Sequence, residues 1–365
     1  MVGISAITAA IGPVIGGWLI EHFSWRWVFF LNVPIAIAVI LLSARVPESR
    51  NEGSSRRIDW LGAFLVIAGL GGVTYALIEW SAHARHGGKL VVAAAIVGVV
   101  ALVGFVAVER ESRTPMVSLK LFRSRNFTGA NLLTLFLYAS LSGLMFFFPM
   151  DLIEVQHYTA TEAGAAFLPF VGIMFGLSRW AGGLVSRYGS RIPLTIGPLV
   201  AAGGIALFAI LPQGGSYWTA FFPAVAVMGL GMTISVAPLT TTVMNAVPES
   251  ESGIASGINN AVSRLAALLA VAVFGAVLIR VFNHALDHQL AGLSLMPDMR
   301  AQIDAARPLL AGAHNPDAAV QRGINAAFVS GYRAVIWIAS GLAVLSSIAA
   351  WLVIESGRGR SAGRI

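Results

Sequence analysis

Long apolar segments alternate with short polar stretches along almost the whole chain. A helix needs about 20 mostly apolar residues to cross the hydrocarbon core of a bilayer. Apolar runs of about this length predict membrane-spanning helices rather than strands. We therefore expect an all-α polytopic membrane protein with about ten transmembrane helices. The ten predicted spans cover residues 4–20, 27–44, 60–78, 90–108, 127–150, 163–185, 192–211, 219–244, 254–282 and 326–354.

The composition agrees with this pattern. Of the 365 residues, 57% are hydrophobic and 11% are charged, and the mean hydropathy is +0.78. About a quarter of the residues of a typical soluble domain are charged, so an ordinary soluble globular protein is excluded. The net charge of +7 arises from basic residues at the ends of apolar runs, which is typical of membrane anchoring and argues against nucleic-acid binding. The expected partner of most of the surface is the lipid bilayer.

The basic residues are unevenly divided between the two sets of loops. The stretches after the second, fourth, sixth and eighth spans, together with the C-terminal tail, contain 14 of the 24 Lys and Arg residues. The opposite side contains 8, and most of these lie in or beside one long loop. Because cytoplasmic loops are enriched in Lys and Arg, the pattern predicts a multi-pass protein of the cell (inner or plasma) membrane with both termini in the cytoplasm.

Three connections are longer than the rest. Residues 45–59 and 109–126 are predicted to be polar cytoplasmic segments, and residues 283–325 form a predicted external loop. Pro297 offers a helix start in this loop, and Met299, Ile303 and Leu310 recur at helical spacing after it. The loop is therefore expected to contain a short amphipathic surface helix.

Signatures of soluble enzymes are absent. The chain has no phosphate-binding G-x-x-x-x-G-K-[ST] motif, no H-E-x-x-H motif and no cysteine. His284 and His288 could share one helical face, but no third ligand follows at a recognisable spacing, so no metal is expected. Asp151 and Glu154 form the one carboxylate pair that would suit a membrane-embedded enzyme acting on lipid-linked substrates. We expect a chain that is not an enzyme and has no cofactor.

The first predicted span contains Gly12, Pro13, Gly16 and Gly17. Proline removes a backbone donor and bends a helix, and the glycines allow neighbouring backbones to approach closely. These properties alone indicate a kinked packing helix. The sequence then continues into Trp25-Arg26-Trp27, Phe29, Asn32 and Pro34 before the second span.

In this combination the segment resembles the fifth and sixth helices of the fourteen-helix drug:proton antiporters, a multidrug-resistance family within the major facilitator superfamily. In that family the Gly-Pro element is the antiporter motif, which lies between two helical bundles and is thought to limit proton leak. Thr8 stands where the motif usually opens with glycine. The resemblance extends along most of the chain, through the basic residues 115–127 and the glycine-rich residues 253–257 with Asn259.

A second motif resembles the cytoplasmic loop motif of the same superfamily. It contains Gly183, Arg187, Gly189 and Arg191, and Ser186 replaces the usual aspartate. The resemblance implies that the glycines permit a tight turn and that the arginines contact helix ends or acidic partners at the cytoplasmic gate.

The resemblance also implies a domain plan. Four helices that begin the family's fold are missing, so the chain is expected to be truncated at its N-terminus. Residues 1–44 would be the last two helices of the N-terminal bundle, 60–108 the two inserted helices, and 127–354 an intact C-terminal six-helix bundle. Residues 355–365 would form a cytoplasmic tail.

The implied function is efflux of a lipophilic or amphipathic small molecule in exchange for protons, by alternating access of one site to the two sides of the membrane. The proton gradient is the expected energy source. A periplasmic adaptor remains open as a partner. A truncated, non-transporting membrane protein is the alternative.

Polar residues inside the spans are the candidates for the site, because each is costly in hydrocarbon unless it faces protein or water. Asn131, Thr134 and Tyr138 recur at helical spacing and could line a cavity or bond two helices together. Asn260 and Arg264 lie one turn apart and are further cavity candidates, although Arg264 could instead form a structural ion pair or extend its guanidinium to the cytoplasmic interface. Asp151 and Glu154 are weak candidates for proton coupling, because their position also fits ordinary wet carboxylates.

Overall fold

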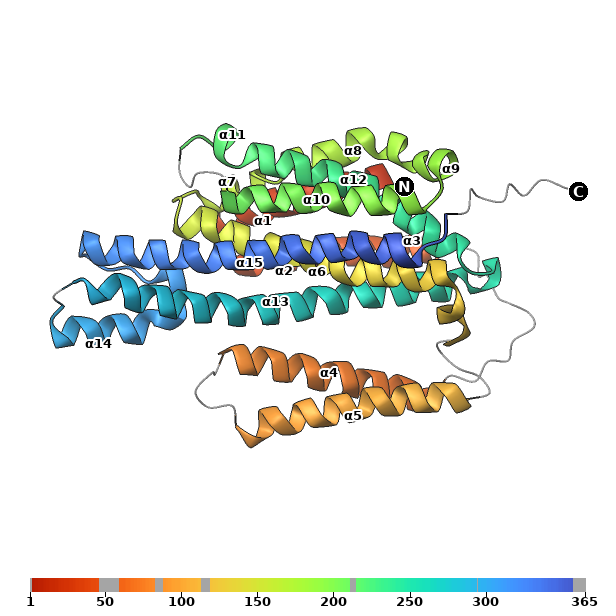
Figure 1. The fold of residues 1–365 in the computed structure, drawn as a ribbon, viewed down its shortest axis with the longest axis horizontal. Coiled ribbons are helices and arrows are strands. Elements are labelled where there is room, and N and C mark those ends of the chain that lie inside the picture. Colours follow the sequence, from red (N-terminus) through yellow and green to blue (C-terminus); the bar gives the residue numbers. More distant parts are fainter. Residues whose placement is uncertain are drawn as a thin grey trace, which may run out of the picture.

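The computed structural model describes residues 2–45, 59–82, 88–112, 119–210, 215–293 and 295–356. Every regular element in these residues is helical (Figure 1). The elements are α1 (Val2–His22), α2 (Trp25–Phe30), α3 (Asn32–Ser43), α4 (Trp60–Ala82), α5 (Lys89–Glu111), η1 (Leu119–Arg123), α6 (Arg125–Glu154), α7 (Ala160–Ala165), α8 (Leu168–Gly182), α9 (Leu184–Tyr188), α10 (Arg191–Ile210), α11 (Tyr217–Ala220), α12 (Phe222–Asn245), η2 (Glu249–Glu251), α13 (Ser252–Ala291), α14 (Pro297–Ala306), η3 (Arg307–Gly312) and α15 (Ala318–Val353).

Nine helical segments of the described residues are long and apolar enough to cross a membrane. They correspond to the second to tenth predicted spans, with α2 and α3 together forming the first of the nine. The remaining predicted span, residues 4–20, is the helix α1. The expected all-α polytopic fold is therefore confirmed.

Helix α15 is the centre of the C-terminal bundle, a name we use for α6 to α15. It packs against α6, α10 and α13. Two serines bond it to α6, because Ser140 donates to the carbonyl of Ala339 at 2.6 Å and Ser346 donates to that of Leu133 at 3.1 Å. Ser340 and Ser347 make the corresponding bonds to α10, at 3.0 and 2.7 Å. Hydroxyl groups that bond to a neighbouring backbone hold helices together where no water competes.

Close contact between helices depends on glycine at two places in this bundle. On α10 and α12, a side chain at Gly204 or Gly231 would collide with the backbone of the facing helix. On α6, a side chain at Gly143 would collide with the ring of Phe274 on α13. Small residues let helix backbones approach in a bilayer, where burial of apolar surface does not drive association.

Phe148 lies at the centre of an aromatic cluster that joins four helical segments. Its ring is fully buried and contacts Phe167, Phe208 and Phe221 at centroid distances of 5.4, 4.8 and 5.5 Å. Edge-to-face and tilted ring pairs of this kind contribute beyond the area that they bury. The cluster fixes the end of α6 against α10 and against the starts of α8 and α12.

The other helices are attached at the edges. α4 and α5 form a hairpin that packs against α13 and lies apart from the rest of the bundle in Figure 1. Asp59 begins α4 by accepting a hydrogen bond from the Gly62 backbone at 2.8 Å. α1 packs against α7 and α8, whereas no residue of α2 or α3 is buried. These exposed apolar helices have the surface of lipid-facing or partner-facing segments.

Two boundaries in the last third of the chain differ from the prediction. α13 does not end near residue 282 but continues to Ala291, because Phe282, Leu286 and Leu290 form a buried row at a spacing of four. The expected amphipathic helix starts at Pro297 and ends at Ala306. Leu310 lies beyond it, in η3, with a positive φ of 54°.

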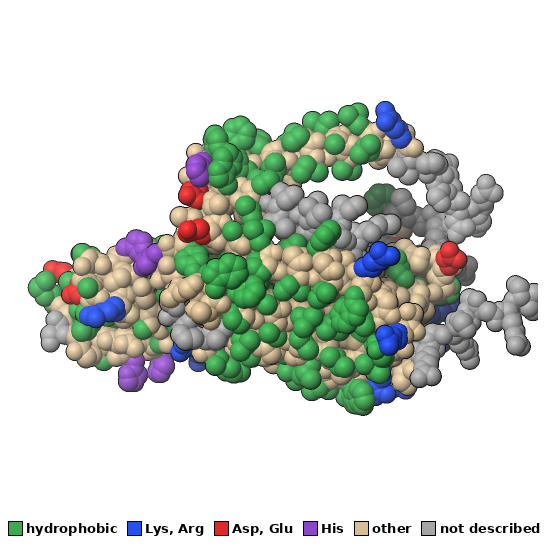
Figure 2. Space-filling model, turned by 90° about the horizontal axis from the view of Figure 1, so that it is seen from above, with side chains coloured by type: hydrophobic (Ala, Val, Ile, Leu, Met, Phe, Trp, Pro, Cys, Tyr) green, Lys and Arg blue, Asp and Glu red, His purple; other side chains and the backbone are tan. Residues whose placement is uncertain are grey.

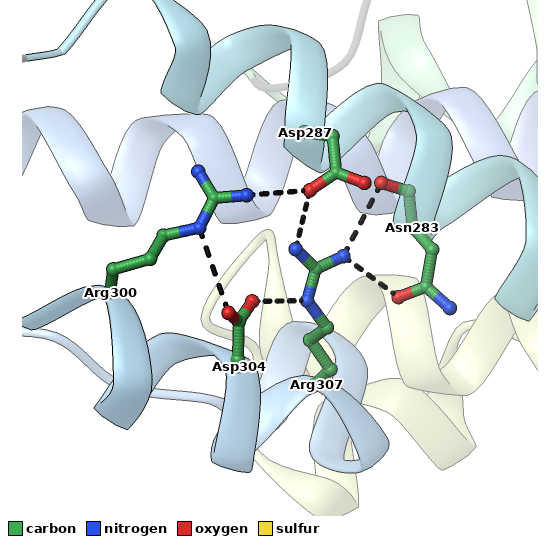
Figure 3. A network of polar contacts seen from close by, with 5 residues as sticks. All are labelled: Asn283, Asp287, Arg300, Asp304 and Arg307. Carbon is green, nitrogen blue, oxygen red and sulfur yellow. Dashed lines mark hydrogen bonds and ion pairs between the residues drawn. The ribbon is translucent and has the colours of Figure 1, made fainter. Parts of the chain in front are cut away.

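An ion-pair network holds α14 and η3 against the extended end of α13 (Figure 3). The guanidinium of Arg307 donates to Asp304 at 2.7 Å and to Asp287 at 2.5 Å, and it also reaches Asn283. Arg300 donates to Asp287 at 2.9 Å. Hydrogen bonds to Asp287 and Asp304 raise the pKa of Arg307 against the opposing effect of its partial burial. The network explains why the residues after α13 form an ordered cap at this end, which we call the α14 end.

Charged and apolar side chains are separated along the helix axes. In Figure 2, hydrophobic side chains cover the middle of the molecule, Lys and Arg gather mainly at one end, and His side chains gather at the other. This is the distribution of a protein whose middle lies in hydrocarbon.

Candidate functional site

The Gly-Pro segment of α1, from Gly12 to Gly17, meets α7 through backbone contact. A side chain at Gly17 would collide with the backbone of Ala160, and one at Gly164 would collide with the carbonyl group of Pro13. Gly12 and Gly16 have open space where a side chain would stand. The two helices therefore approach through Gly17 and Gly164, and no motif in the sequence indicates the role of Gly164.

A polar contact closes the same interface at its α14 end. The carboxylate of Glu21 accepts hydrogen bonds from the hydroxyl of Thr161 at 2.5 Å and from its backbone N–H at 3.4 Å. Thr161 lies in the first turn of α7, where backbone N–H groups have no partner within the helix. Glu21 thus joins α1 to the C-terminal bundle. Sequence analysis missed this residue because its partner lies 140 positions away.

Three polar side chains meet between α6 and α13. The amide of Asn259 donates to the hydroxyl of Thr134 at 2.7 Å and to the side-chain oxygen of Asn131 at 3.2 Å. Asn131 and Thr134 are buried, and each also donates to the backbone of its own helix. Tyr138, on the same helix, is half-buried against the core. In this conformation Asn131 and Thr134 bond two helices together.

Asn260 and Arg264 lie on a different face of α13. Both are exposed, as is Gly257 one turn earlier. Asn260 donates to the carbonyl of Ser256 at 3.1 Å within its own helix. The adjacent asparagines thus have different surroundings, one at a helix interface and one on an open polar face.

Asp151 is fully buried at the end of α6. Gln156 bonds to its carboxylate, and Tyr332 and Arg333 of α15 lie within electrostatic range. Tyr332 is also fully buried, and its hydroxyl has no hydrogen-bond partner among the described residues. Glu154, one turn later, is half-buried, and Gly312 of η3 lies close to its carboxylate. The two carboxylates therefore have different environments, since only Asp151 is enclosed.

The glycine-rich loop turns the chain between α8 and α10. Gly183 ends α8 and begins α9, and Gly189 ends α9 with a φ of 75°, a conformation that favours glycine. Arg187 is exposed. The guanidinium of Arg191 lies 4.0 Å from the centroid of the Trp351 ring on α15, a cation–π contact between two helices.

His284 and His288 lie on one face of α13, with ring centroids 6.2 Å apart. No group of three or more His, Cys, Asp or Glu residues in the described part of the chain is placed to hold a metal ion.

These features agree with one family of membrane proteins. The sequence profile of the Major Facilitator Superfamily matches residues 1–271. The chain belongs to the Major Facilitator Superfamily. This membership supports a transporter rather than an enzyme, and it agrees with the helical fold.

Similar proteins are named for multidrug transport or for drug resistance. The multidrug transporter protein MdtP of Bacillus subtilis is 28% identical over 90% of this chain and 62% of its own length. The puromycin resistance protein pur8 of Streptomyces alboniger is 30% identical over 95% of this chain and 64% of its own length. The multidrug resistance protein Stp of Mycobacterium tuberculosis is 31% identical over 79% and 53%. The chain spans less than two thirds of the length of each relative.

A solved structure shares the fold. It is the crystal structure of a bacterial homologue of the human lysosomal transporter Spinster in an inward-facing and occupied conformation. The TM-score is 0.50 at 17% identity, over 96% of this chain and 81% of the other.

Proposed function

We propose that this chain acts in the efflux of lipophilic or amphipathic small molecules across a cell membrane, in exchange for protons. The observation that carries the proposal is its similarity, over 79% to 95% of its residues, to proteins named for multidrug transport or for multidrug or puromycin resistance. Because the chain covers only part of each relative, the activity is proposed for the transporter in which these helices work.

The packing suits a rocking mechanism. Serine hydroxyls and glycine contacts join α6, α10, α12, α13 and α15 into one body. α1 contacts this body through α7 and α8. In the whole transporter we assign α1 to a second bundle, and a limited interface between two bundles can open at one end while the other end closes, which is what alternating access requires. The exposed face of α13 that carries Asn260 and Arg264 is the proposed wall of the substrate cavity.

Proton coupling is proposed for Asp151. An enclosed carboxylate in a membrane protein binds or releases a proton when its surroundings change, and this biases the equilibrium between two conformations. Arg333 and the buried hydroxyl of Tyr332, both on α15, lie around this carboxylate, so a conformational change that lets water reach this end of the bundle would change those surroundings. We further propose cytoplasmic termini, from the distribution of Lys and Arg.

Transport in everted membrane vesicles tests the proposal. The protein is expressed from its native gene, a pH gradient is imposed, and uptake of a lipophilic fluorescent dye is followed. Uptake should require the gradient and should stop when a protonophore dissipates it. Equal uptake by vesicles from cells without the gene would show that the chain is a non-transporting membrane protein.

A further inference from the structure

A groove lies at the α14 end of the C-terminal bundle, between the start of α8 and the short helix α11. It encloses about 450 Å³ of space. Its lining contains the rings of Tyr158, Tyr217 and Trp218, apolar side chains between Ala165 and Pro169, and one charged residue, Glu162. Among the described residues that line the groove, none is Lys or Arg.

The carboxylate of Glu162 is fixed in place. The backbone N–H of Thr159 donates to Glu162 Oε2 at 2.9 Å, and the backbone N–H of Glu162 donates to the hydroxyl of Thr159 at 3.2 Å. This reciprocal pair is a capping box, which begins α7 and restrains the side chain of Glu162. A carboxylate has about four acceptor positions, so one bond from Thr159 leaves capacity for a ligand.

Tyr217, on the aromatic side of the groove, is also held in place. The hydroxyl of Tyr217 donates to the carbonyl of Ala166 at 2.7 Å, and the ring of Tyr217 lies 5.6 Å from that of Trp218 in an edge-to-face arrangement. Burial, with a contribution from nearby Tyr158, raises the pKa of Tyr217 to about 12. This phenol is therefore neutral at physiological pH, and Glu162 supplies the charge of the groove.

We propose that this groove is a peripheral binding site for an organic cation with an apolar body. Aromatic faces attract cations through their quadrupoles, and a fixed carboxylate adds a full opposite charge. An ammonium or phosphonium group on an apolar body can be bound by aromatic rings and one carboxylate, whereas a hard metal ion needs several oxygen ligands around it. The cation is either a free amphipathic molecule or the amine headgroup of a lipid. The site goes beyond the proposed efflux, because it lies outside the cavity wall on α13.

Glu162→Gln is the sharpest probe of this site. Glutamine also forms the capping box, so the substitution removes the charge and keeps the start of α7. The binding of tetraphenylphosphonium to the purified full chain is measured in nanodiscs of phosphatidylglycerol. Tetraphenylborate, which has the same shape and the opposite charge, is the second probe. Glu249→Gln, an exposed carboxylate outside the groove, and Trp337→Ala, an exposed tryptophan on α15, are the matched controls.

The expected result is a loss of tetraphenylphosphonium affinity of about fivefold in Glu162→Gln and in Trp218→Ala, with neither control affected. Tetraphenylborate should not bind more weakly to Glu162→Gln than to the original chain. The proposal is overturned if both groove variants keep their tetraphenylphosphonium affinity, or if both probes weaken equally.

A second measurement locates the bound cation and identifies its source. The chain has no cysteine, so a single Ala165→Cys reports on the groove, and tetraphenylphosphonium should slow its alkylation. Unchanged alkylation at saturating cation would overturn the proposal. Nanodiscs that also contain phosphatidylethanolamine distinguish the two sources. If this lipid weakens tetraphenylphosphonium binding, the groove binds the lipid amine. If it does not, the groove binds a free cation. Both measurements use no pH gradient, so they remain interpretable if the chain does not transport.

Discussion

Glu21 and Thr161 connect two parts of the molecule that are 140 residues apart in sequence, through hydrogen bonds of 2.5 and 3.4 Å to one carboxylate oxygen. The contact lies beside the backbone approach of α1 and α7. The contact between Glu21 and Thr161 is polar and exposed, whereas the approach at Gly17 and Gly164 depends on the absence of a side chain. The two contacts therefore contribute differently to the interface.

Replacing Glu21 by alanine should let the interface open more often at the α14 end. Because the contact is exposed, the effect on the opening equilibrium should not exceed about fivefold. A single cysteine at Ala160, in a chain that otherwise has none, reports opening through its rate of reaction with a maleimide. Thr161→Ala removes the hydroxyl donor and should raise the rate of the maleimide reaction by a smaller factor than Glu21→Ala. An unchanged rate in Glu21→Ala would show that the hydrogen bonds do not hold the helices together.

The glycine contact should tolerate substitution far less. Gly164→Leu places a side chain against the Pro13 carbonyl, and overpacking of this kind costs about 1–3 kcal/mol. Gly172→Leu on α8 is the matched control, because a side chain there meets open space. We expect thermal unfolding in detergent, followed by tryptophan fluorescence, to occur at lower temperature only in Gly164→Leu. Equal midpoints would contradict the tight approach of α1 and α7.

Asn259 and Asn260 give a second matched pair. Asn259→Leu removes a donor to Thr134 and Asn131 and should destabilise the bundle by about 1 kcal/mol, the range found for polar contacts between membrane helices. Asn260→Leu changes the exposed face and should leave the unfolding midpoint unchanged while it impairs transport. Loss of stability in Asn260→Leu instead of Asn259→Leu would show that Asn260, and not Asn259, faces α6.

This pair also shows what the sequence can and cannot predict. Apolar run length predicted the helices, because the bilayer sets their minimum length. The polar residues inside the membrane could also be found, because they interrupt these apolar runs. Their partners could not, because adjacent positions on a helix point about 100° apart and only the neighbouring helix decides which one is buried. The sequence therefore does not distinguish the interface residue Asn259 from the exposed Asn260, and it does not indicate the contacts of Glu21 and Gly164.

The end of α13 illustrates a different limit. Its residues after 282 include His284, Asp287 and His288, a polar composition that indicated a loop. Phe282, Leu286 and Leu290 nevertheless continue the helix, because they are buried where α15 and η3 pack against α13. A polar face on a helix that leaves the membrane is not distinguishable from a loop by hydropathy alone.

The enclosure of Asp151 leads to the last prediction, which concerns energy coupling. Asp151→Asn keeps the size of the side chain and removes its ability to exchange a proton. If Asp151 carries the coupling, transport driven by a pH gradient should fall to the level of vesicles without a gradient. Exchange of labelled for unlabelled substrate should continue, since it needs the conformational change and not net proton movement. Both rates are measured in the same vesicles.

Glu154→Gln is the control for this experiment, because Glu154 is on the same helix but only half-buried. It should leave driven transport largely intact. If Asp151→Asn stops exchange as well as driven transport, the carboxylate is needed for the structure of the α6–α15 interface rather than for coupling. If it stops neither, the coupling group lies elsewhere in the transporter. Loss of driven transport with exchange retained is the one outcome that a purely structural role of Asp151 would not produce.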